Sequence, residues 1–97
     1  MYDWDEAKRR AAAAKHGVDF ADIVRFNWAS AVTRADTRRD YGEPRFISFG
    51  KLDGVICACA WTPRGETVRI IMLRRANARE RKRYERDGEA EKLYRQE

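Results

Sequence analysis

The chain has 97 residues, of which 43% are hydrophobic and 38% charged, and its formal net charge is +5. This length suits one domain with a modest core, spanning residues 1–97, and is too short for two, while the hydrophobic fraction is too high for a disordered tail. The chain contains no apolar run near the ~18 residues that cross a membrane. Its acidic start also lacks the apolar core of a signal peptide. We therefore expect a single cytoplasmic domain with no membrane partner.

Two helices are predicted before any sheet. The first begins at Asp3 or Asp5, because either carboxylate can accept the free N–H groups of a first turn. It continues through the alanines at 11–14 and stops at Gly17. Asp19 can cap a second helix. Such a pair would suit a DNA-reading helix-turn-helix, but the strand-rich half that follows argues against it.

A small antiparallel sheet is predicted for the middle of the chain. Its strands are expected at about 31–35, 45–51, 55–62 and 67–73. Asp53-Gly54 has the composition of a two-residue hairpin turn, and residues 36–44 form a charged loop broken by glycine and proline. The fold class is therefore α+β, with three or four antiparallel strands and a C-terminal helix.

Cys57 and Cys59 lie two residues apart in a strand and point to one face. Their Cα atoms would be about 6.6 Å apart, near the upper limit for a disulfide. We expect two buried free thiols. One histidine and two cysteines do not make a zinc site, so no metal and no cofactor are expected.

The final helix is expected to dock weakly. Asn77 and Glu80 have the spacing of a capping box at its start. From residue 77 to 86 the one large apolar side chain is Tyr84, so little area is available for burial. The dipeptide Asp87-Gly88 predicts a break, leaving residues 87–97 as a ragged extension.

Basic residues are concentrated near the C-terminus. Residues 74–97 contain nine Lys and Arg against six acidic residues, more than half of the net charge. A solvated, salt-bridged helix has this composition, but a basic surface also attracts polyanions. Arg74 and Arg75 stand where a strand ends and a helix begins, and a guanidinium group offers planar donors suited to phosphate. The pattern favours a phosphate-rich ligand, above all RNA.

Five motifs occur in a specific order along the chain: W-D-x-x-K, K-H-G-V-x-F, G-E-x-R, T-x-R-G and R-I-I-x-x-R-x-A-N-x-R-E-x-x-x-Y. They begin at Trp4, Lys15, Gly42, Thr62 and Arg69, and the last ends at Tyr84. Together they resemble the BrnT toxins of bacterial type II toxin–antitoxin systems, over about residues 2–86.

The resemblance implies a fold similar to RelE-type ribonucleases and an activity that inhibits translation by cutting RNA, either free or on the ribosome. It also implies neutralisation by a BrnA-like antitoxin that has a ribbon-helix-helix DNA-binding part. On this basis the chain contacts RNA directly and DNA only through the antitoxin complex, which represses its own operon.

Two positions depart from the family pattern. Family members usually have Asn where this chain has Ala12, and Ser where it has Met72. Residues two apart in a strand share a face, so Met72 should point the same way as Arg74. A bulky thioether there would shrink or dry the site and attenuate the toxin.

RelE-like sites cut RNA through its own 2′-OH, which requires alignment, charge stabilisation and proton transfer. The resemblance assigns Arg74 to clamp the scissile phosphate. Arg64 would be a second clamp or would donate to the leaving group electrostatically, and Tyr84 would orient the 2′-OH or stack on a base. The proton acceptor is open among Glu43, Glu80 and His16. Each also has a structural reading, as a salt-bridge partner, a capping residue and a helix-end cation respectively.

Further arginines and a lysine are candidates for binding RNA without catalysis. Arg45 and Lys51 share a strand face and could line a groove. Arg38 lies in the charged loop. The remaining candidates are Arg75 and Arg79.

Alternation places Arg69 on the face opposite Arg74, where it would serve the sheet surface or a partner. Two rivals remain open for the whole chain. One is a non-catalytic RNA- or ribosome-binding module that uses the same arginines, and the other is a DNA-binding regulator that acts alone.

Overall fold

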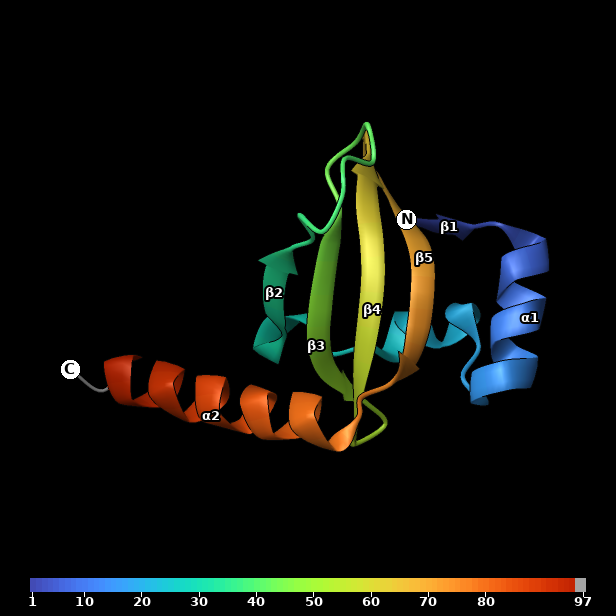
Figure 1. Cartoon of the computed structure of the whole chain (residues 1–97). Coiled ribbons are helices and arrows are strands. Elements are labelled where there is room, and N and C mark those ends of the chain that lie inside the picture. Colours follow the sequence, from blue (N-terminus) through green and yellow to red (C-terminus); the bar gives the residue numbers. More distant parts are fainter. Residues whose placement is uncertain (96–97) are drawn as a thin grey trace.

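The computed structural model describes residues 1–95, with side chains through residue 87, and shows an α+β fold (Figure 1). Its elements are the strands β1 (Tyr2–Trp4), β2 (Val32–Ala35), β3 (Phe46–Leu52), β4 (Val55–Arg64) and β5 (Thr67–Arg75), the α-helices α1 (Glu6–His16) and α2 (Ala78–Arg95), and the 3₁₀ helices η1 (Phe20–Arg25) and η2 (Trp28–Ser30). The five strands make one sheet in the order β1-β5-β4-β3-β2.

Strands β2 to β5 form the predicted antiparallel meander. The β3–β4 turn has positive φ at both Asp53 (52°) and Gly54 (82°), as a type I′ hairpin requires. The prediction of three or four strands, all antiparallel, was wrong at one edge. There β1 pairs with β5 in parallel, with Tyr2 opposite Val68. Three residues that pair with a strand more than sixty positions away leave no periodic signal.

Helix α1 begins at the second of its two predicted caps. The Lys8 N–H donates to Oδ1 of Asp5 at 3.0 Å, while Asp3 lies in β1 and pairs with Arg69 at 3.5 Å. Gly17 ends the helix with φ of 70°, the left-handed conformation that favours glycine.

The second predicted helix begins at its predicted cap but is a 3₁₀ helix. Asp19 accepts from the Ala21 N–H at 2.9 Å, and the Asp19 N–H donates to Asp22 at 3.3 Å. With three residues per turn, side chains at i and i+3 lie on the same side. Phe20 and Ile23 therefore enter the core together, at 1% and 0% exposure.

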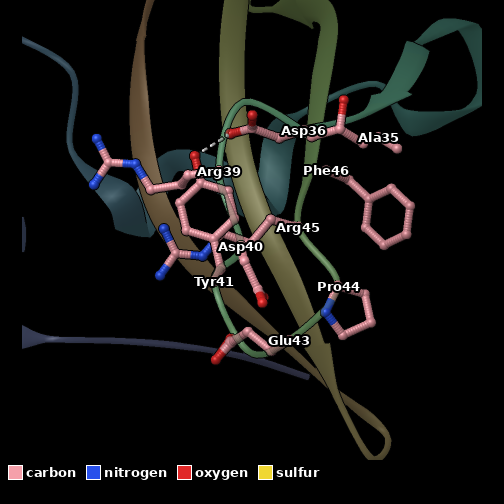
Figure 2. A pocket seen from close by; sticks show the side chains of 10 residues that line it. Ala35, Asp36, Arg39, Asp40, Tyr41, Glu43, Pro44, Arg45 and Phe46 are labelled. Carbon is pink, nitrogen blue, oxygen red and sulfur yellow. Dashed lines mark hydrogen bonds between the residues drawn. The ribbon is translucent and has the colours of Figure 1, made fainter.

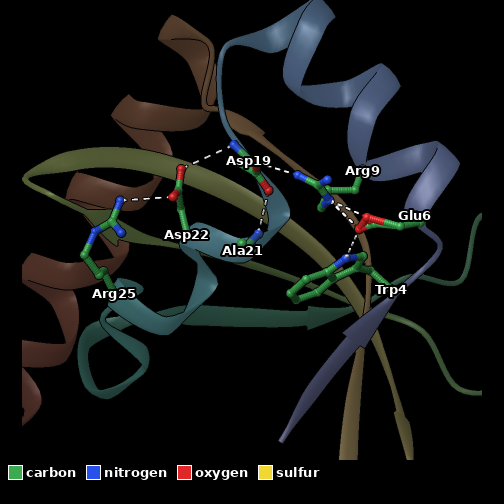
Figure 3. A network of polar contacts seen from close by, with 7 residues as sticks. All are labelled: Trp4, Glu6, Arg9, Asp19, Ala21, Asp22 and Arg25. Carbon is green, nitrogen blue, oxygen red and sulfur yellow. Dashed lines mark hydrogen bonds and ion pairs between the residues drawn. The ribbon is translucent and has the colours of Figure 1, made fainter.

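A polar network joins α1 to η1 (Figure 3). Arg9 bridges the two elements, with contacts of 2.6 Å to Glu6 and 2.7 Å to Asp19. Trp4 also donates its indole N–H to Glu6 at 3.1 Å. The network fixes α1 beside the η1 entry.

The core lies on one face of the sheet, which we call the core face. Ile70 and Leu73 of β5 and the free thiols of Cys57 and Cys59 pack there against η1, and the two cysteines are buried as predicted. The buried Ser48 hydroxyl accepts the indole N–H of Trp61 at 2.8 Å.

A β-bulge in β5 changes which residues share a face. Ile70 pairs with Trp61 and Met72 with Ala60, so Ile71 is an extra residue. Ile70 and Leu73, three apart, are consequently both buried. The same shift brings Arg69 onto the face that carries Arg74. The prediction from strict alternation, which separated these two arginines, was therefore wrong.

The other face, which we call the α2 face, is covered by α2 at one end of the strands (Figure 1). Helix α2 starts with both halves of the predicted capping box, at 2.8 and 2.9 Å between Asn77 and Glu80. It does not break at Asp87-Gly88 but continues to Arg95, past the edge strand β2. A glycine inside a helix costs only ~1 kcal/mol, and Asp87 is held by Arg34 of β2.

The last two residues of the predicted ragged extension, 96–97, lie outside the described residues. None of the helices in the described chain combines the length and apolarity that a membrane span requires.

Candidate functional site

A bidentate ion pair marks the junction of β5 and α2. Both terminal nitrogens of Arg74 donate to Glu80, at 2.7 and 2.9 Å, and one Glu80 oxygen also accepts the Asn77 N–H. The fork of a guanidinium fits two oxygens of a carboxylate as it fits two oxygens of a phosphate. In this structure the fork of Arg74 is held by the carboxylate of Glu80.

The pair shifts the pKa values of both groups. The hydrogen bond from Arg74 lowers the pKa of Glu80 from its usual value, against the effect of partial burial. The hydrogen bond to Glu80 raises the pKa of Arg74, while burial and the positive charge of Arg38 act the other way. Arg38, from the charged loop, therefore acts electrostatically on Arg74.

Three further residues belong to this site, two on α2 and one on β2. Tyr84 lies one turn beyond Glu80 on the same helix face, and its hydroxyl donates to the Ser30 carbonyl at 3.2 Å. Arg34 pairs with Asp87 at 2.5 Å. We call Arg34, Arg74, Glu80, Tyr84 and Asp87 the α2 cluster.

A second charged group lies at the opposite end of the sheet, around the loop that precedes β3 (Figure 2). Glu43 pairs with Arg64 at 3.2 Å, and Arg45 lies over the Tyr41 ring at 4.1 Å. One oxygen of Glu43 and the Nε of Arg45 are buried without a hydrogen-bond partner. We call Arg39, Tyr41, Glu43, Arg45 and Arg64 the loop cluster.

The carboxylate of Asp36 accepts hydrogen bonds from other residues of this loop. This carboxylate, 4% exposed, accepts from Arg38 at 2.9 Å and from the Tyr41 hydroxyl at 3.0 Å. The hydrogen bond from Arg38 is the main cause of a strongly lowered Asp36 pKa. The loop thus holds Tyr41 and Arg38 in fixed positions.

The two clusters are far apart. In the β4–β5 ladder Arg64 pairs with Thr67, whereas Arg74 pairs with Ala58, six residues along β4. Six residues of strand span about 20 Å. The two guanidinium groups also contact different carboxylates, Glu43 and Glu80. The structure therefore does not bring Arg64 and Arg74 to a single phosphate, and Arg64 as a second clamp is not supported.

The other predicted site residues are dispersed. His16 is the last residue of α1, which packs against β5 and η1 on the core face, away from α2. Arg75 pairs with Cys57 and so points to the core face at an exposed end. Lys51 is exposed on β3, and Arg79 is exposed on α2 beside the α2 cluster.

Met72 lies where the strand pattern predicted. It pairs with Ala60, and Arg74 pairs with the next-but-one residue, Ala58, so the two share the α2 face. Ala12, the other departure, packs against the core cluster from α1.

Arg34 and Asp87 were missed by sequence reasoning. They are 53 positions apart, and their contact depends on α2 crossing the edge strand β2. A helix that was expected to break at Asp87 gave no reason to pair it with a strand. No local signal identifies such a contact.

The fold and the α2 cluster define a small α+β protein with a bidentate arginine–glutamate pair at the start of its C-terminal helix. Within the described residues, no group of three or more His, Cys, Asp or Glu side chains is arranged to hold a metal ion. The family model described as "Ribonuclease toxin, BrnT, of type II toxin-antitoxin system" matches residues 4–80. The chain therefore belongs to the BrnT family of ribonuclease toxins. Comparison with curated proteins gave no match.

Proposed function

We propose that the chain cleaves RNA without a metal, by attack of the 2′-OH on the adjacent phosphorus, at the α2 cluster. The observation that carries the proposal is the bidentate Arg74–Glu80 pair, because its geometry is that of a phosphate clamp. Family membership independently implies an RNA substrate and a protein antitoxin.

Substrate binding would begin with an exchange of anions on Arg74. The scissile phosphate takes the two guanidinium donors that Glu80 now holds. Oxygen Oε1 of Glu80 keeps the Asn77 N–H, whereas among the described side chains the one hydrogen-bond donor that contacts Oε2 is Arg74. The exchange therefore frees a carboxylate oxygen beside the bound phosphate.

Glu80 would then take the proton of the attacking 2′-OH. The new bond joins the 2′-oxygen to phosphorus, and the bond to the 5′-oxygen breaks. The leaving oxygen takes a proton from solvent, so the products are a 2′,3′-cyclic phosphate and a 5′-hydroxyl end. Arg74 stabilises the extra negative charge of the pentavalent phosphorus in the transition state.

The loop cluster would bind the same strand at a distance. Measured along the strands, Arg64 lies about 20 Å and Arg45 about 13 Å from the level of Arg74, and both would hold phosphates remote from the cleaved bond. Glu43, held by Arg64, would then be a structural partner there. His16 lies on the other side of the sheet and has no part in this proposal.

The test is incubation of the purified chain with RNA in EDTA, followed by chemical typing of the new ends. We expect 5′-hydroxyl ends, and a rate loss of about 10²–10³-fold in Arg74→Ala. Arg10→Ala, on the exposed side of α1, removes the same charge far from the site and is the matched control. Equal rates in Arg74→Ala and wild type would contradict the proposal.

A non-catalytic RNA-binding module is a second candidate. It is favoured by one observation: Arg74 is already bound by Glu80, with the bulky Met72 on the same face. In that case Arg74→Ala would weaken RNA binding, and wild type would produce no new ends.

We propose further that a BrnA-like ribbon-helix-helix antitoxin neutralises the chain by covering α2, and that free toxin stops translation. Helix α2 extends beyond β2, so a partner can reach it from the open side. Addition of the chain to a cell-free translation reaction should stop synthesis, and pre-mixing it with the antitoxin should restore synthesis. Persistent inhibition by the mixture would exclude this partner.

A further inference from the structure

Helix α2 presents a polar stripe to an apolar patch of the sheet. Val32 and Phe49 pair across β2 and β3 on the α2 face, and both are half-buried. The helix residues opposite them are Arg79, Glu80, Arg83, Tyr84 and Asp87. A helix on an apolar surface normally contributes an apolar stripe. Among the described side chains of α2, which end at residue 87, only Tyr84 does so.

The mismatch leaves a hollow between helix and sheet. Its volume is about 170 Å³, with Val32 and Phe49 on the sheet side and Tyr84 on the helix. Pockets for drug-sized ligands have about 300–1,000 Å³. This hollow therefore suits a smaller flat group.

Charges at the rim define the chemistry of that group. Three arginines, Arg34, Arg79 and Arg83, line the hollow together with Glu80 and Asp87. Arginines donate to base carbonyl and ring nitrogen acceptors, and carboxylates accept from exocyclic amino groups. Aromatic and guanidinium planes also stack on bases. The rim and the apolar floor together match a nucleobase.

We propose that this hollow binds the nucleobase next to the phosphate held by Arg74. The inference rests on the proposed function, because Glu80 is shared by the hollow and by the Arg74 clamp. A phosphate on Arg74 places the attached nucleoside within reach of the hollow. Tyr84, whose hydroxyl is bound to Ser30, contributes its ring as a stacking wall.

The test uses a 2′-O-methyl RNA hexamer, which lacks the attacking hydroxyl and stays intact, and six versions that each lack one base. Dissociation constants are measured by fluorescence anisotropy. Loss of a base from a stacking site costs about tenfold or more in affinity. We expect that loss at one position and smaller changes elsewhere.

Two variants test whether the hollow is the place where the base binds. Val32→Phe fills the hollow from β2 and should make the intact and the base-deleted hexamers bind alike, with an unchanged Tm as the control for folding. Arg83→Ala removes a rim donor and should reduce the discrimination. Its matched control is Lys82→Ala, the adjacent cation on the outer side of α2, which should keep the discrimination.

The proposal is overturned if no base deletion changes wild-type affinity more than twofold, or if no hexamer binds. It is also overturned if Val32→Phe keeps full discrimination; the hollow would then be a packing gap or a site for a partner's side chain. Arg74-dependent cleavage without base discrimination would refute this inference alone. Base discrimination without Arg74-dependent cleavage would refute the proposed chemistry alone.

Discussion

The two faces of the sheet are covered in different ways. On the core face, η1 and α1 bury aliphatic and aromatic side chains so that Ile23 and Leu73 are fully enclosed. On the α2 face, a helix with a mainly polar inner stripe leaves a hollow and holds an ion pair at its start. The buried apolar side chains that stabilise the fold lie mainly on the core face. The charged side chains that could contact a ligand lie on the α2 face.

The cysteines illustrate the consequence for reactivity. Burial on the core face raises the pKa of Cys59 to about 12 and also raises that of Cys57. Thiols with raised pKa values are poor nucleophiles at neutral pH because the thiolate is scarce. The two buried thiols are therefore not expected to act as nucleophiles.

The largest expected effect of a single change is a loss of stability on the core face. Leu73→Ala should lower the free energy of unfolding by about 2–5 kcal/mol, because it leaves a cavity among fully buried neighbours. Urea unfolding of this variant should be compared with that of Met72→Ala, which truncates the adjacent, half-exposed residue on the α2 face. Equal losses would mean that the two faces contribute alike to stability.

Arg74→Lys should separate charge from geometry on the α2 face. Lysine keeps the positive charge but loses the planar fork, so cleavage should fall by about tenfold or more while unfolding changes little. Rates with RNA and unfolding curves measure the two effects. A wild-type rate in Arg74→Lys would show that charge alone is sufficient.

Local patterns predicted most of the meander. Its predicted strand bounds agree with the structure within two residues, because alternation and the Asp53-Gly54 turn are local signals. The parallel strand β1 was missed because it depends on pairing with a strand more than sixty positions away. The bulge at Ile71 was missed because strict alternation gives no sign of an extra residue.

The candidate site shows the same limit. The capping box of Asn77 and Glu80 was correctly predicted, since it lies within four residues. The separation of Arg64 from Arg74 followed from the hairpin and could have been predicted. The two residues flank opposite ends of β5, and a nine-residue strand keeps them apart.

A smaller effect is expected at the start of α2. Asn77→Ala should cost about 0.5–2 kcal/mol of stability, because the Glu80 N–H loses its cap. Amide exchange at residues 78–84 should accelerate in this variant and keep the wild-type rate in Asp5→Ala, which uncaps α1 instead. Unchanged exchange in α2 would mean that the cap does not limit its opening.

The stability of the first turn of α2 should depend on pH. The folded-state pKa of Glu80 is below the usual 4.5, so its stabilising contribution is present above that value and is lost as pH falls through the folded pKa. NMR titration of the Glu80 carboxyl should give a value below that of unfolded chain. In Arg74→Ala it should rise, because the main cause of the shift is removed. A Glu80 pKa that is the same in both proteins would refute the pairing.

The smallest effects are expected where the chain departs from its family. Met72→Ser shortens a side chain beside Arg74 on the α2 face, so cleavage should rise by up to about tenfold if the thioether restricts the site. Ala12→Asn, on α1, should change stability and leave cleavage unaltered, because Ala12 packs against the core face. Cleavage rates and unfolding curves of both variants test whether cleavage depends on the α2 face and stability on the core face. An increase in cleavage from Ala12→Asn, with none from Met72→Ser, would mean that the reacting groups lie on the α1 side of the sheet, and Arg74 would then lose its assigned place.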